Sequence, residues 1–75
     1  MATKISPKNP NQRKLWIKHQ LELIGESYAT IGRELGVTRH CVRRAMVIHY
    51  PKMERAIAAK LQMRPEDIWP ERYTA

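Results

Sequence analysis

The sequence contains a single cysteine, Cys41, among its 75 residues, which excludes an internal disulfide. A lone cysteine is typical of a protein in a reducing compartment, so we expect a cytoplasmic protein. One cysteine and three scattered histidines also do not make a structural zinc site. We therefore expect neither a metal nor a cofactor.

The sequence also lacks long apolar runs. None approaches the ~20 residues of a membrane-spanning helix, and residues 1–7 lack the continuous apolar segment of a secretory signal. A chain this short forms one domain with a modest core, which leaves little scaffold for a catalytic cleft. No nucleophile–base pair, paired carboxylates or phosphate-binding glycine loop occurs. We expect no catalysis, no membrane contact and no small-molecule effector.

Acidic residues are few, with seven Asp and Glu against fourteen Lys and Arg, for a net charge of +7. Residues 1–18 contain five basic residues and no acidic one, and residues 38–64 contain seven basic residues and only Glu54. Blocks of one sign favour a polyanionic partner. Binding to a membrane surface would require bulky apolar side chains that are free to insert into the lipid. A core this small needs those side chains for its own packing. The composition therefore favours nucleic acid.

Helical periodicity and capping residues predict an all-α chain, because no alternating run indicates a strand. We expect residues 1–8 to be a flexible basic arm and residues 9–75 to be one DNA-binding domain. The expected helices of this compact bundle lie at about residues 10–24, 28–35, 39–48, 51–61 and 65–69. The expected buried stripe of the first helix consists of Leu15, Ile17, Leu21 and Ile24.

Residues 28–47 contain two short helical segments joined by a three-residue turn, the pattern of a helix-turn-helix. Gly32 is small at the place where the two helices must cross closely. Gly36 permits the left-handed conformation that a tight exit from the first helix requires. Thr38 is a suitable N-cap for the second helix. We therefore predict that the helix at residues 39–48 is a recognition helix.

The outer face of that helix is basic. If Val42, Ala45 and Met46 point inward, helical periodicity places the Arg and His side chains outside. Arg donates two hydrogen bonds to guanine O6 and N7, or holds a phosphate. We predict double-stranded DNA as the partner, with this helix in the major groove. The predicted DNA-binding residues are Thr38, Arg39, His40, Arg43, Arg44, Ser27, Tyr28 and Lys52.

The C-terminal run at residues 57–73 contains the motif P-E-x-I-W-P-x-R-Y at residues 65–73. With this motif, residues 9–75 resemble the Ner/Nlp family of small helix-turn-helix regulators, which are phage Ner-like and have the lambda-repressor-like fold. The resemblance implies a five-helix DNA-binding domain and a transcriptional regulator, commonly a repressor. The family often has Trp-Pro before its fourth helix, where this chain has Tyr50-Pro51. The recognition face is also more basic than expected of relatives, so no operator sequence is carried over.

Together these features predict a sequence-specific transcriptional regulator, with repression as the favoured activity. A single copy makes few DNA contacts, which favours a homodimer on repeated half-sites. A helical protein-interaction module and a non-specific architectural DNA binder remain as alternatives. An RNA binder is less favoured, because single strands select an exposed aromatic platform. We expect Trp69 and Tyr73 to close the end of the core instead of stacking on bases, and Cys41 to be a small buried residue.

Overall fold

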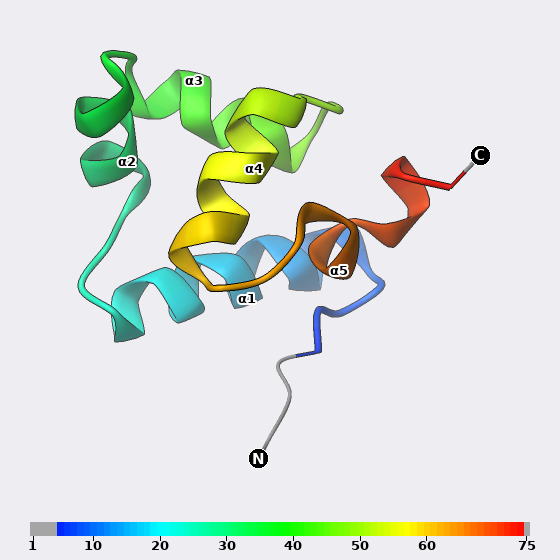
Figure 1. Cartoon of the computed structure of the whole chain (residues 1–75). Helices are drawn as coiled ribbons and strands as arrows, with labels where there is room; N and C mark the ends of the chain where they lie inside the picture. The colour runs from blue at the N-terminus through cyan, green and yellow to red at the C-terminus, as the bar shows by residue number, and fades with distance from the viewer. Residues whose placement is uncertain (1–4, 75) are drawn as a thin grey trace.

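Local capping and periodicity produce an all-helical chain in the computed structural model, which describes residues 5–74 (Figure 1). No strand occurs in this range, and none of its helices is long and apolar enough to cross a membrane. The predicted fold class is confirmed. The elements are α1 (Pro10–Leu23), α2 (Tyr28–Leu35), α3 (Arg39–Arg43), the 3-10 turn η1 (Arg44–Met46), α4 (Pro51–Lys60), α5 (Pro65–Ile68) and the 3-10 turn η2 (Pro70–Arg72).

α1 begins at a side-chain cap and ends at a left-handed glycine. The Asn9 side chain accepts hydrogen bonds from two backbone N–H groups of the first turn, at 2.9 and 3.1 Å. Gly25, with φ +75°, follows the helix end. The predicted buried stripe is only half right: Ile17 and Leu21 are buried, whereas Leu15 is 71% and Ile24 46% exposed. The face that meets the core repeats every four residues and includes Arg13, and Ile24 lies beyond the last helical turn.

One core joins all five helices. Its buried apolar residues are Ile17, Leu21, Ile31, Val42, Ala45, Met46, Met53, Ile57, Ala58, Leu61, Ile68 and Trp69. Trp69 closes the C-terminal end of this core, as predicted, whereas Tyr73 stays partly exposed. Cys41 is half-buried and lies 3.4 Å from the Tyr50 hydroxyl. The large apolar side chains of α3 and α4 therefore all lie in the core.

The segment before α1 lies against the domain where the structure describes it. The Ser6 hydroxyl donates to the Ile68 carbonyl at 2.9 Å, and the Arg13 guanidinium donates to the Pro7 carbonyl at 2.9 Å. This part of the predicted arm thus has fixed hydrogen-bond partners. The remainder of the arm, residues 1–4, lies outside the described residues.

The turn between α2 and α3 has the predicted chemistry. Ser27 caps α2 in a reciprocal capping box with Thr30, and Gly36 leaves α2 with φ +73°. The Thr38 hydroxyl accepts the Cys41 N–H at 3.2 Å and caps α3. The helix predicted at residues 39–48 is shorter in the structure, because α3 tightens into η1, which ends at Met46. Backbone carbonyls at this end accept hydrogen bonds from Arg72 in place of a further helical turn.

Gly32 permits the close approach of α2 to this turn. A Cβ there would lie 2.7 Å from the Val37 carbonyl oxygen and 3.1 Å from the Thr38 carbonyl, and backbone atoms cannot rotate away. Alanine ordinarily stabilises a helix by about 1 kcal/mol relative to glycine. Here we expect Gly32→Ala to lower the free energy of unfolding by about 1–2 kcal/mol, because overpacking outweighs that gain. Urea denaturation measures the change.

Gly36→Ala is the control, because no atom lies within 4 Å of a Cβ at that position. Its cost is the backbone strain of a left-handed residue, about 1–2 kcal/mol. A Gly32→Ala variant as stable as the wild type would show that α2 does not require the close approach.

Candidate nucleic-acid interface

A groove of about 390 Å³ lies between α1 and α3. Its walls carry basic side chains from both helices, and no acidic residue lines it. The lining residues are Lys14, Leu15 and Lys18 of α1, Tyr28 of α2, Arg39, His40 and Arg43 of α3, and Met46 of η1. A second groove of about 320 Å³ adjoins it, lined by Lys14, His40, Arg43, Arg44, Met46 and Val47.

The orientation of α3 follows from what it buries. Val42 and Ala45 are fully buried and anchor one side of the segment in the core. The four basic side chains of the segment, Arg39, His40, Arg43 and Arg44, are all exposed. The arrangement thus presents three guanidinium groups and an imidazole to solvent from one short segment.

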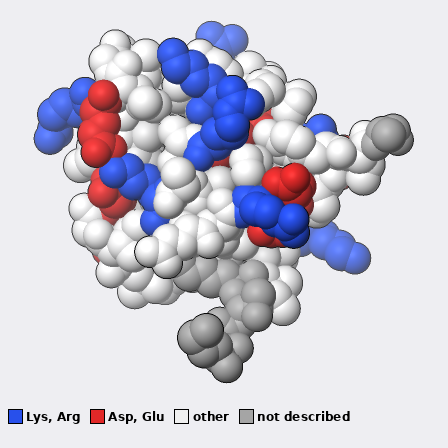
Figure 2. All heavy atoms as spheres, in the orientation of Figure 1, with Lys and Arg blue, Asp and Glu red and all other residues white. Residues whose placement is uncertain are grey.

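The lysines and arginines that line the two grooves make no side-chain hydrogen bond or ion pair among the residues that the structure describes. Within residues 5–74, none of Lys14, Lys18, Arg39, Arg43 and Arg44 makes a side-chain hydrogen bond or ion pair. Some basic groups elsewhere are paired with carboxylates; Lys60, for example, lies 2.6 Å from a carboxylate oxygen of Glu34. Figure 2 shows a face on which several Lys and Arg side chains lie directly beside acidic ones. Unpaired cations in a groove without carboxylates favour an anionic ligand.

The other predicted contact residues are placed differently. Tyr28 lines the groove of about 390 Å³ between α1 and α3. Burial raises the pKa of its hydroxyl there, although the charge of Arg43 acts to lower it. Ser27 and Thr38 are exposed, and their hydroxyls serve as helix caps. Lys52, on α4, is exposed but lines neither groove. The structure therefore brings Tyr28 together with the α3 residues and does not bring Lys52 to them.

Sequence reasoning missed Lys14 and Lys18 as members of this surface. Both belong to the acid-free block at residues 1–18 and are spaced four apart, so they share a helix face. The assignment of Leu15 to the core turned that side of α1 inward. In the structure Ile17 and Leu21 are still buried, but Leu15 is exposed and lines the groove with the two lysines.

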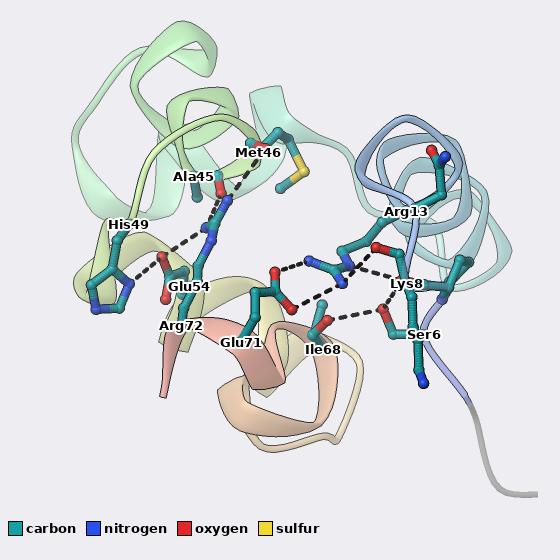
Figure 3. A network of polar contacts seen from close by, with 12 residues as sticks. Ser6, Lys8, Arg13, Ala45, Met46, His49, Glu54, Ile68, Glu71 and Arg72 are labelled. Atoms are coloured by element: carbon teal, nitrogen blue, oxygen red, sulfur yellow. Dashed lines mark hydrogen bonds and ion pairs between the residues drawn. The ribbon is translucent and has the colours of Figure 1, made fainter. Parts of the chain in front are cut away.

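A buried polar network lies behind α3, around a carboxylate with no exposed surface (Figure 3). Glu54 accepts hydrogen bonds from the Tyr50 N–H at 2.6 Å and from the Tyr73 hydroxyl at 2.6 Å. It also lies 3.0 Å from His49 Nδ1 and 2.9 Å from Arg72. The same Arg72 donates to backbone carbonyls at the end of η1, so the network ties η1 to α4 and the C-terminal turn.

A buried cation, Arg13, fixes α1. Arg13 is 4% exposed and its guanidinium donates two hydrogen bonds to the Glu71 carboxylate. It also donates to the Pro7 carbonyl. Figure 3 shows Arg13 and Glu71 facing one another between α1 and the C-terminal turn. This pairing sets the rotation of α1 about its axis, and with it the direction of the neighbouring Lys14.

Two carboxylates that accept hydrogen bonds, the buried Glu54 and the exposed Glu71, predict acid sensitivity. Burial acts to raise the pKa of Glu54, but the hydrogen bonds that it accepts outweigh burial and hold the pKa below 4.5. The hydrogen bond from Arg13 lowers the pKa of Glu71. A carboxyl whose pKa is lowered in the folded state stabilises the protein at pH values above its unfolded-state pKa. This stabilisation is lost as the pH falls toward the folded-state pKa.

We therefore expect the free energy of unfolding to decrease as the pH falls below about 4.5, the ordinary glutamate value. Glu71→Gln should flatten part of this decrease, because one of the carboxyls with a lowered pKa is then absent. Urea denaturation at a series of pH values measures both curves. Parallel wild-type and variant curves would show that Glu71 contributes nothing to the acid response.

Comparison with known proteins places this geometry in a family. A family model described as winged helix-turn-helix DNA-binding matches residues 13–75. A protein of Escherichia phage D108 named "Negative regulator of transcription" is 36% identical over 61 residues, covering 73% of this chain and 84% of the phage protein. A protein of the same name from Escherichia phage Mu is 39% identical over 49 residues, 65% of each chain.

Proposed function

This chain belongs to the winged helix-turn-helix DNA-binding family, and we propose that it is a sequence-specific, Ner-like repressor of transcription. The observation that carries the proposal is the exposed basic face of α3, which follows a helix-turn-helix bend and whose arginines have no hydrogen-bond or ion-pair partner within residues 5–74. The names of the two phage relatives favour repression over activation. We propose no catalytic activity.

In the proposed complex α3 lies in the major groove. Arg39, His40, Arg43 and Arg44 divide between base edges and phosphates. Arg and Lys side chains also attract DNA irrespective of its sequence, so the affinity falls with salt. Bound protein then represses by excluding polymerase from the same DNA.

The remaining predicted residues contact the DNA backbone in this proposal. Ser27 and Tyr28 stand at the beginning of α2, where backbone N–H groups favour a phosphate. Thr38 stands at the beginning of α3, and Lys52 extends the contacts along the flank. Two copies on repeated half-sites supply the specificity that a single small domain lacks.

Selection of binding sites from random duplexes by the intact chain tests the proposal. We expect an enriched sequence, and a logarithm of the binding constant that falls linearly with the logarithm of salt concentration. Equal affinity for the selected and random duplexes would favour an architectural binder. Affinity that ignores salt would favour the protein-interaction module.

A further inference from the structure

We infer that α1 forms a second DNA-binding element, in which Lys14 and Lys18 hold phosphates of the strand that flanks the major groove occupied by α3. The inference rests on the proposed function and adds residues to it. The groove between α1 and α3 brings the two lysines to the same cavity as Arg39, His40 and Arg43. Lys14 also lines the adjoining groove with Arg44.

The dimensions of DNA support a backbone ligand for α1. An α-helix with its side chains is about 10–12 Å across, and the major groove of B-DNA is about 12 Å wide. A helix seated in that groove therefore fills it from one sugar–phosphate ridge to the other. An element beside the helix then meets the ridge and not the base edges. Here α1 is that element, because its lysines share a groove with α3.

The basic residues of α1 divide into two roles. Arg13 is buried and paired with Glu71, which fixes the helix. The side chains of Lys14 and Lys18 make no hydrogen bond or ion pair within residues 5–74 and lie in a groove without acidic lining. Cations held together without a counter-charge repel one another, and phosphates would relieve that repulsion.

Leu15 fits the same occupant. Its side chain is 71% exposed and lines the groove with the two lysines. A backbone strand offers apolar deoxyribose between its phosphates, so a leucine flanked by lysines matches it.

The salt dependence of duplex binding tests the assignment in the intact chain. Each phosphate contact contributes about 0.9 to the slope of log binding constant against log salt. The double variant Lys14→Gln/Lys18→Gln should therefore lose roughly 1.8 from the slope, since two contacts are removed. The loss should be the same on the selected site and on random duplex.

Two matched variants complete the experiment. Arg55→Gln removes one positive charge from an exposed position of α4 that lines neither groove, and its slope should equal that of the wild type. Lys14→Arg/Lys18→Arg keeps both charges and should also keep the slope. Thermal melting of each variant confirms that the helices are intact.

The outcomes separate this inference from the proposed function. A double Gln variant with the wild-type slope would overturn the role of α1 and leave a salt-dependent, sequence-specific wild type intact. A loss confined to the selected site would also overturn it, because phosphate contacts carry no sequence information. A wild-type chain without salt-dependent binding would overturn the proposed function itself.

Discussion

Replacing Arg72 by methionine is expected to lower the free energy of unfolding by about 3–5 kcal/mol, because it removes one partner of a buried ion pair. The Glu54 carboxylate has no exposed surface, and Arg72 lies 2.9 Å from it with 15% of its side chain exposed. The backbone carbonyls of Ala45 and Ile48 lose a donor at the same time. A domain of this size has a total stability on the order of 5–15 kcal/mol, so the loss is severe.

Urea denaturation of Arg72→Met against Arg64→Met isolates the effect of burial. Arg64 also pairs with a carboxylate, Asp67, at 3.0 Å, but its side chain is 74% exposed. Exposed pairs contribute about 0–1 kcal/mol, so Arg64→Met should change the stability little. If the two variants lost equal free energies of unfolding, the network of Glu54 and Arg72 would not stabilise the end of η1.

Replacing Arg43 by alanine is expected to weaken specific DNA binding by about 1–3 kcal/mol if Arg43 is one of the side chains that read a guanine. Arg43 lines both grooves, and its removal breaks no side-chain hydrogen bond or ion pair within the described residues. Every 1.4 kcal/mol corresponds to a tenfold change in Kd, so the expected increase is roughly 5- to 150-fold. Fluorescence titration with the selected duplex measures it.

Competition with random duplex supplies the control for Arg43→Ala. A base-reading arginine loses affinity for the selected site and not for random DNA. An equal loss on both duplexes would assign Arg43 to a phosphate instead. Arg55→Ala, which removes a charge remote from both grooves, should change neither affinity.

The features that sequence predicted well depend on neighbouring residues. The Asn9, Ser27 and Thr38 caps and the left-handed Gly36 each depend on residues within a few positions, so local rules sufficed. The burial of Trp69 also followed from its place beside two prolines at the end of the core. These local features determine the bend that turns α3 outward.

The features that sequence missed depend on residues far apart in the chain. Arg13 is buried because Glu71, 58 positions away, accepts its hydrogen bonds. That pairing turns α1 so that Leu15 points to solvent, which periodicity alone did not indicate. The early end of the recognition segment at Met46 likewise depends on Arg72. Lys14 and Lys18 were missed as groove residues for the same reason, because the orientation of α1 depends on the distant Glu71.

The central claim is that α3 places guanidinium groups against base edges in the major groove. Guanine N7 is a major-groove acceptor for arginine, and methylation removes it without altering the phosphates. A selected duplex methylated at N7 of its contacted guanine should bind with a Kd raised by roughly 5- to 150-fold, corresponding to about 1–3 kcal/mol. Unchanged affinity at every methylated guanine of the selected site would contradict major-groove reading by α3.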